Sequence, residues 1–232
     1  MKELRKVLPS ARFIYYADNA HCPYGEKSAA YIQDRARAIT RLLLDKGAEA
    51  VVVACNTATG AAIATLRAEF DVPFVGMEPA IKPAALGTRS GVIGVLATAG
   101  TLKASKYLNT KGMFENEVRI EEHVGEGFVQ LVEGRQLDGP ETERVVRASL
   151  QPLLDAGADT IVLGCTHYPF LLPVIRRIAG PGVQVIDPAP AVARQLMHVL
   201  HEHGIAEADP TPGVELLSSG DPSSLHALFA CL

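Results

Sequence analysis

LLDKGAEAVVVAC (43–55) and LLDAGADTIVLGC (153–165) are two versions of one sequence pattern. In each copy a segment with helical spacing ends at a glycine, a short apolar run follows, and the run stops at a cysteine. An apolar run without alternation is typical of a strand in a parallel sheet that is covered on both faces. The duplication therefore predicts an α/β protein built from two related halves.

The rest of the chain supports this reading, because short β-branched runs alternate with amphipathic segments. The fold class expected is α/β, with two pseudo-symmetric domains that are each a mostly parallel sheet flanked by helices. Ligands bind beyond the carboxyl ends of parallel strands, so an active site is expected in a cleft between the domains. The predicted strands are 13–17, 50–54, 74–76, 92–97, 118–123, 160–164 and 183–186, and the clearest helices are 28–46, 142–156 and 169–178.

Composition narrows the class of protein. The chain has 232 residues, 48% of them hydrophobic, and a net charge of -4 with scattered charged residues, so neither nucleic acid nor an acidic membrane is an expected partner. No apolar run approaches about 18 residues, which favours a cytoplasmic protein. The four cysteines and the glycines form no disulfide framework, metal motif or nucleotide-binding motif, so no metal and no nucleotide cofactor is expected.

The two repeated cysteines, Cys55 and Cys165, are the strongest catalytic candidates. A lone cysteine at the end of a strand is usually a core residue, but a cysteine that recurs at the matching place in both halves points to shared chemistry. A thiol has an ordinary pKa of about 8.5, so one thiolate and one thiol coexist near neutral pH. Such a pair is suited to removing a proton from one face of a carbon and returning one to the other.

Polar residues beside these cysteines are candidates for binding a carboxylate and stabilising a developing enolate. His167, two residues after Cys165, would tune that thiol or shuttle its proton, although it would also fit as a hydrogen-bonded residue at a strand end. Cys22 and Cys231 have no counterpart in the repeat and are interpreted as incidental thiols. The donors of suitable type are Asn56, Thr57, Thr98, Thr101 and Thr166, and the loop 18–25 adds Asp18, Tyr24 and Gly25 as substrate contacts.

Six segments carry a family resemblance. These segments resemble the aspartate/glutamate racemase superfamily, and the motifs PYG and FVxLVE resemble its glutamate racemase branch. The segments are ADNAHCPYGEKS (17–28), VVVACNTAT (51–59), GMEPAIKPA (76–84), VIGVLATAGT (92–101), FVQLVE (128–133) and VLGCTHYPFL (162–171).

The resemblance implies cofactor-independent interconversion of L-glutamate and D-glutamate by two cysteines, supplying D-glutamate for peptidoglycan. By this resemblance Cys55 handles the proton of D-glutamate, Cys165 handles that of L-glutamate, His167 assists Cys165, and Glu133 accompanies His167. It also implies domains of 1–79 with 189–232, and of 80–188. The implied substrate-binding pairs are Tyr24-Gly25, Asn56-Thr57 and Thr166-His167.

One departure from the family pattern concerns the first half. Members of the family begin with a strand and an Asp-Ser-Gly-x-Gly-Gly loop, which this sequence lacks, and the strand 92–97 correspondingly has no counterpart in the first half. Either the chain is shortened at an internal methionine or it is a degenerate copy, and the vacant strand position would invite association, such as a homodimer. Two alternatives to glutamate racemisation stay open: aspartate racemase or a related isomerase, and a non-catalytic binding or interaction protein. The segments 18–28 and 79–85 also resemble those of relatives that depend on UDP-N-acetylmuramoyl-L-alanine, and this resemblance implies the same activator.

Overall fold

The computed structural model describes residues 1–221, 225 and 229, and the chain divides into two compact units. Unit 1 contains residues 1–54, residues 61–77 and the chain from Ala189 onward, and unit 2 contains residues 55–60 and 78–188. The short segment 55–60 thus groups with unit 2, whereas the family resemblance places it in the first domain. Cys55 and Cys165 consequently belong to the same unit.

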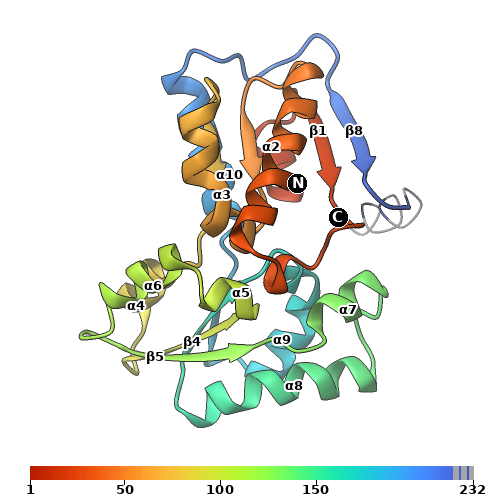
Figure 1. The fold of residues 1–232 in the computed structure, drawn as a ribbon. Coiled ribbons are helices and arrows are strands. Elements are labelled where there is room, and N and C mark those ends of the chain that lie inside the picture. The colour runs from red at the N-terminus through yellow and green to blue at the C-terminus, as the bar shows by residue number, and fades with distance from the viewer. Residues whose placement is uncertain (222–224, 226–228, 230–232) are drawn as a thin grey trace. The chain divides into compact units, whose positions relative to one another are not determined.

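Unit 1 carries two separate parallel strand pairs, β1 with β8 and β2 with β3. Strand β8 lies beside β1 although about two hundred residues separate them in the chain (Figure 1). The elements are α1 (Lys2–Val7), β1 (Arg12–Ala17), η1 (Tyr24–Glu26), α2 (Ala29–Asp45), β2 (Val51–Val53), α3 (Asn56–Glu69), β3 (Phe74–Gly76), α10 (Ala189–Glu202) and β8 (Gly213–Ser218), with α3 beginning in unit 2.

The β2–β3 pair is covered on both faces, as its apolar sequence predicts. On one face Val51 and Phe74 pack against α3 residues such as Leu66. On the other face Val75 packs against α10 through Leu196 and Leu200. The core of unit 1 therefore consists of two layers of helices around short strands.

Unit 2 contains a four-stranded parallel sheet in the order β5-β4-β6-β7. In the repeat, β1 corresponds to β5 and β2 corresponds to β6. Strands β5 and β6 both pair with β4, whereas β1 and β2 belong to different sheets. The elements are α4 (Ile81–Gly87), β4 (Val92–Ala97), α5 (Ala99–Leu102), α6 (Ser105–Gly112), β5 (Arg119–Val124), α7 (Phe128–Glu133), α8 (Pro140–Asp155), β6 (Thr160–Gly164), η2 (Tyr168–Leu171), α9 (Leu172–Ala179) and β7 (Gln184–Ile186).

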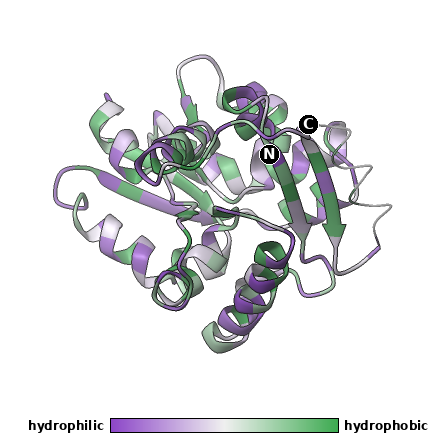
Figure 2. Cartoon of the chain, turned by 90° about the horizontal axis from the view of Figure 1, so that it is seen from above, coloured by the Kyte–Doolittle hydropathy of each residue, from purple (hydrophilic) through white to green (hydrophobic). Residues whose placement is uncertain are grey.

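Alternate residues of β4 divide the core of unit 2 between its two faces. Ile93 and Val95 lie in one cluster with Ile81 of α4 and Tyr107 of α6. Gly94 faces the opposite way, where α8 approaches so closely that an added Cβ would lie 3.0 Å from Leu153. Figure 1 shows α8 along that side of β4 and β5, and Figure 2 shows hydrophilic and hydrophobic residues alternating along the helices.

The repeated glycines end their helices as the sequence predicts. Gly47 follows α2 with a φ of 87°, and Gly157 follows α8 with a φ of 90°. The next residue closes each turn, because the Ala48 N–H donates to the Leu43 carbonyl and the Ala158 N–H to the Leu153 carbonyl. These bonds satisfy carbonyls at the helix ends and turn the chain into β2 and β6.

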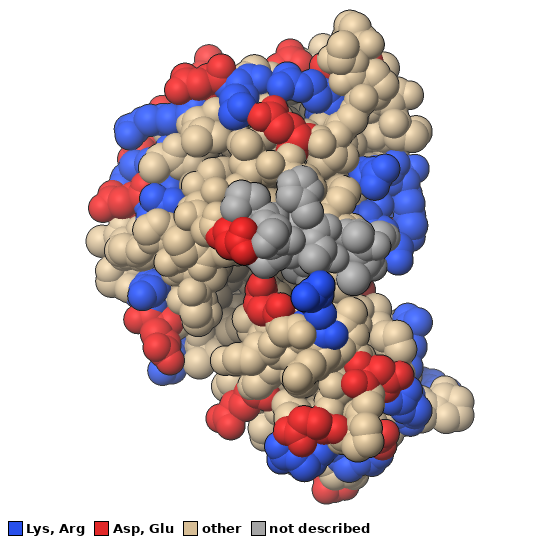
Figure 3. Space-filling view, turned by 90° about the vertical axis from the view of Figure 1, so that its right-hand side faces the viewer, with Lys and Arg blue, Asp and Glu red and all other residues tan. Residues whose placement is uncertain are grey.

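The predicted strands and helices are confirmed to within a few residues, and β8 is the strand that the sequence did not indicate. None of the helices in the described part of the chain has the length and apolar character that crossing a bilayer requires. On the face that Figure 3 shows, basic side chains lie beside acidic ones over much of the surface. This mixture matches the scattered charges in the sequence.

Candidate active site

Cys55 lies where β2 ends and α3 begins. The Cys55 carbonyl accepts the Thr59 N–H at 2.8 Å, and its Sγ accepts the Ala58 N–H at 3.5 Å. Burial raises the pKa of the Cys55 thiol, and the charge of Cys165 raises it further, while hydrogen bonds from Ala58 and Thr57 oppose both effects. The net effect favours the protonated form of the Cys55 thiol.

Cys165 follows β6 and is the first member of a chain of three side chains. Its Sγ lies 3.9 Å from Nδ1 of His167, and Nε2 of His167 lies 2.7 Å from Oε1 of Glu133. Glu133 is the last residue of α7, whose buried Phe128 ring packs against Tyr168, the residue after His167. The packing of α7 on η2 thereby brings Glu133 to the imidazole.

The groups around the His167 imidazole favour its protonated form. Burial opposes the imidazolium, but the hydrogen bonds and charges of Cys165 and Glu133 outweigh it and raise the pKa of His167 to about 9. The same hydrogen bond lowers the pKa of Glu133, despite the opposing effect of its partial burial. The resulting imidazolium lies between the Glu133 carboxylate and the Cys165 sulfur.

Three threonine hydroxyls join α3 to α5. Oγ1 of Thr57 lies 3.2 Å from that of Thr98 and 3.3 Å from that of Thr101, and Thr98 also caps α5 by accepting the Thr101 N–H. The close approach of α3 depends on Gly60, because a Cβ there would lie 2.8 Å from Cβ of Ala104. These contacts explain why residues 55–60 group with unit 2.

Asn56 is the least satisfied polar side chain of the site. It is 5% exposed, and neither Oδ1 nor Nδ2 has a hydrogen-bond partner among the described residues. A buried amide without partners costs free energy, and such groups are explained most often by a functional role. Asn56 is therefore suited to receive a polar ligand next to Cys55.

The predicted site residues divide between the two units. Tyr24 and Gly25 lie in η1 of unit 1, where the Tyr24 hydroxyl donates to the Asp18 carboxylate. Cys22 is exposed, and Cys231 lies outside the described residues. The predicted residues in unit 2 are Cys55, Asn56, Thr57, Thr98, Thr101, Glu133, Cys165, Thr166 and His167.

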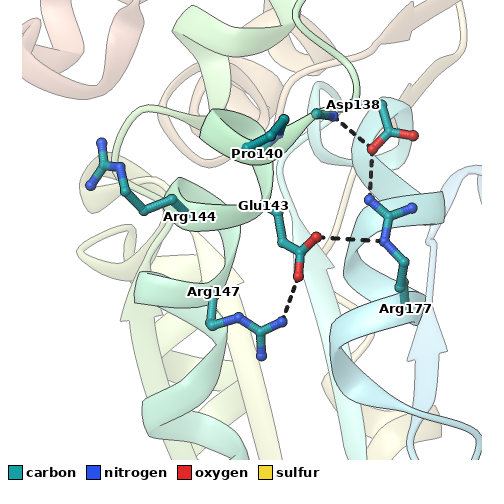
Figure 4. A pocket seen from close by; sticks show the side chains of 7 residues that line it. Asp138, Pro140, Glu143, Arg144, Arg147 and Arg177 are labelled. Atoms are coloured by element: carbon teal, nitrogen blue, oxygen red, sulfur yellow. Dashed lines mark hydrogen bonds and ion pairs between the residues drawn. The ribbon is translucent and has the colours of Figure 1, made fainter.

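A pocket at the start of α8 is lined by residues other than these predicted ones. Figure 4 shows Arg147 and Arg177 directed at Glu143, and Arg177 also reaching Asp138. The Arg177 to Asp138 distance is 2.6 Å and the Arg147 to Glu143 distance is 2.7 Å. Arg177 connects α9 with α8 through Glu143 at 3.8 Å. No sequence pattern indicates a site there.

Two thiols in one unit, one of them with an imidazole and a carboxylate behind it, are suited to acid–base chemistry that moves a proton at carbon. Residues 2–196 match the model of the Asp/Glu/Hydantoin racemase family. The chain is 46% identical to the glutamate racemase of Ectopseudomonas mendocina, over 100% of this chain and 89% of the relative. It is 47% identical to that of Methylococcus capsulatus, over 97% and 83%.

A solved structure agrees with these sequence relatives. The crystal structure of Escherichia coli glutamate racemase superposes with a TM-score of 0.88 at 35% identity, covering 98% of this chain and 86% of that one. The chain belongs to the Asp/Glu/Hydantoin racemase family and, within it, to the glutamate racemases.

Stability should depend on pH through the Glu133–His167 pair. Because folding raises the pKa of His167 from about 6.5 to about 9, its stabilisation is complete below pH 6.5 and is lost as the pH rises through 9. His167 is 27% exposed, so solvent screening limits the loss to the order of 2 kcal/mol. We expect Glu133→Gln to lower the pKa of His167 and to flatten this fall, measured by urea unfolding at pH 6 and pH 9.

Glu141→Gln is the matched control, because Glu141 pairs with Arg144 on the surface at 2.6 Å. It should leave the difference in stability between pH 6 and pH 9 as it is in the parent chain. The same difference in both variants and in the parent would contradict a role for the Glu133–His167 pair.

Proposed function

We propose that this protein interconverts L-glutamate and D-glutamate without a cofactor, in the cytoplasm, and so supplies D-glutamate for peptidoglycan. The observation that carries the proposal is the chain of contacts from Cys165 Sγ through His167 to Glu133, in the same unit that holds Cys55. In the proposed mechanism one sulfur is a thiolate while the other is protonated. A racemase needs this state before either enantiomer reacts.

For L-glutamate, the Cys165 thiolate takes the α-proton, so that the C–H bond breaks and an S–H bond forms. The electron pair of the C–H bond passes into the α-carboxylate as an enolate. Cys55 then gives its proton to the opposite face of the carbon and becomes the thiolate. D-glutamate reacts by the same steps in reverse, starting from a Cys55 thiolate.

Hydrogen-bond donors around the cysteines are proposed to stabilise the negative charge of the substrate carboxylate and of the enolate. Asn56, with its unpartnered amide, and Thr57, beside Cys55, are proposed to hold a substrate carboxylate. Protonated His167, held by Glu133, stabilises the Cys165 thiolate before proton abstraction. Four further residues are proposed as substrate contacts, namely Tyr24, Gly25, Thr98 and Thr101, and Thr166 is proposed beside Cys165.

A comparison of glutamate with aspartate tests the proposal. Racemisation is followed by circular dichroism, and α-proton exchange by mass spectrometry in deuterated water. We expect kcat/KM for glutamate to exceed that for aspartate by about 10- to 200-fold, the discrimination that one methylene group provides. Faster turnover of aspartate would identify an aspartate racemase, and glutamate binding without exchange would identify a non-catalytic binding protein.

The same assay tests regulation. The Escherichia coli glutamate racemase was crystallised with L-glutamate and the activator UDP-MurNAc-ala. We propose that this chain responds to the same compound, since the two share 35% identity over nearly the whole chain. Addition of UDP-N-acetylmuramoyl-L-alanine should increase the rate of glutamate racemisation, and an unchanged rate would contradict this.

A further inference from the structure

Unit 1 contains a buried carboxylate that the proton-transfer chemistry does not use. Asp18 follows the last residue of β1, and its side chain is only 6% exposed. Arg35 of α2 donates to both of its oxygens, from Nη2 at 2.6 Å and from Nε at 3.0 Å. A paired donation of this kind fixes the orientation of the carboxylate as well as neutralising its charge.

Asp18 also organises the loop that follows it. Its carbonyl accepts the N–H groups of His21 and Cys22 at 3.0 and 3.1 Å, which closes the turn after β1. Its carboxylate accepts the hydroxyl of Tyr24, six residues further along. One residue therefore holds both the start of the loop and the ring near its end.

Arg35 supplies the charge that makes this arrangement stable. Burial alone raises the pKa of Asp18, but hydrogen bonds from Arg35 and Tyr24 outweigh it and lower the pKa below the ordinary value. Burial and the Asp18 charge both raise the pKa of Tyr24, so its hydroxyl keeps the proton that it donates. Without Arg35, a buried carboxylate would lack its cation, which is costly.

Helix α2 gives Arg35 a rigid support. Its first turn is capped by Ser28, whose side chain accepts the Tyr31 N–H at 3.2 Å. Gln33, on the same helix, donates to the Ala61 carbonyl at 2.9 Å, within unit 1. The guanidinium is thus presented from a helix that is anchored to its own unit.

We infer that Arg35 is a positioning residue, which holds the ring of Tyr24 through the Asp18 carboxylate and thereby orients the Tyr24–Gly25 turn for the substrate. The inference rests on the proposed function, because it takes Tyr24 and Gly25 as substrate contacts. It adds to that function a specific support for substrate binding, distinct from the two thiols that move the proton.

The test separates substrate binding from chemistry. We expect Arg35→Met to raise KM for both enantiomers of glutamate by about 10-fold while kcat changes by less than about 3-fold, because a contact of the substrate, and none of the reacting groups, is displaced. Arg35→Lys keeps the charge but loses the paired donation, so its KM should lie between those of the parent and of Arg35→Met. An unchanged KM in Arg35→Met, or a fall in kcat alone, would overturn the inference.

Arg37→Met is the matched control on the same helix. Arg37 pairs with Glu69 at 2.8 Å and with Asp34 at 2.8 Å on the surface of unit 1, and its loss should leave KM unchanged. An equal rise of KM in both variants would show a general effect on α2 and would overturn the inference. If Arg35→Met does not fold, the Lys variant alone decides, because its KM must rise above that of the parent.

A double-mutant cycle tests the route through Tyr24. In a Tyr24→Phe background, which lacks the hydroxyl, Arg35→Met should raise KM by less than it does in the parent chain. Full additivity would show that Arg35 does not act through the tyrosine. These outcomes are distinguishable from failure of the proposed function, because that failure would appear as absent glutamate racemisation in the parent chain itself.

Discussion

Replacing either Cys55 or Cys165 by alanine is expected to lower kcat/KM for glutamate racemisation by about 1,000-fold or more. Each substitution removes one of the two groups that exchange a proton with the α-carbon, and a positioned acid or base contributes about 100- to 10,000-fold. The two effects should be far from additive, because either thiol is useless for racemisation without the other. The rate is measured by circular dichroism from both enantiomers.

Two further measurements distinguish loss of the two-thiol reaction from a general effect of removing a thiol. Cys22→Ala removes an exposed thiol and should leave the rate unchanged. In Cys55→Ala, the remaining Cys165 should still exchange the α-proton of L-glutamate for deuterium without inverting the carbon. Racemisation at the parent rate in both active-site variants would exclude the two-thiol mechanism.

Replacing Asn56 by leucine is expected to change stability and activity in opposite directions. The buried amide has no partner among the described residues, so an apolar side chain of similar volume should raise the free energy of unfolding by about 1 to 2 kcal/mol. The same change removes hydrogen bonds to a charged substrate, which are worth about 1.5 to 3 kcal/mol each, so kcat/KM should fall by about 10- to 100-fold. Urea unfolding and the racemisation assay give the two measurements.

Asn109→Leu provides the control, since Asn109 lies exposed in α6. It should alter neither the free energy of unfolding nor kcat/KM by a comparable amount. If Asn56→Leu instead destabilises the protein, then the amide has partners in solution and is a structural residue.

The two halves of the repeat differ at the residues beside the cysteines. His167 stands two residues after Cys165, and Thr57 stands two residues after Cys55. Cys165 therefore has an imidazole and a carboxylate near its sulfur, while Cys55 has the N–H groups of a helix start and a group of hydroxyls. The helix–strand pattern is repeated, but the side chains that surround the two thiols are not.

Much of the fold could be predicted from local sequence because its signals are local. A short continuous apolar run such as that of β6, which follows a glycine at a helix end, favours a strand covered on both sides. Gly157 ends α8 because its φ of 90° suits glycine. Strand β8 was missed because its residues are half-buried and mix polar with apolar character. Its place is decided by pairing with β1, from the other end of the chain.

The sequence by itself determined the α/β class, the two cysteines at matching strand ends, and the histidine beside one of them. Only the tertiary structure decided that residues 55–60 group with unit 2. It also decided that the Thr57 hydroxyl lies within hydrogen-bond distance of that of Thr101, and that Arg35 donates hydrogen bonds to Asp18. Thr57 and Thr101 are 44 residues apart, and Asp18 and Arg35 are 17 apart. Periodicity and capping act within a few residues along the chain, whereas such partners are chosen by how the helices pack against the strands.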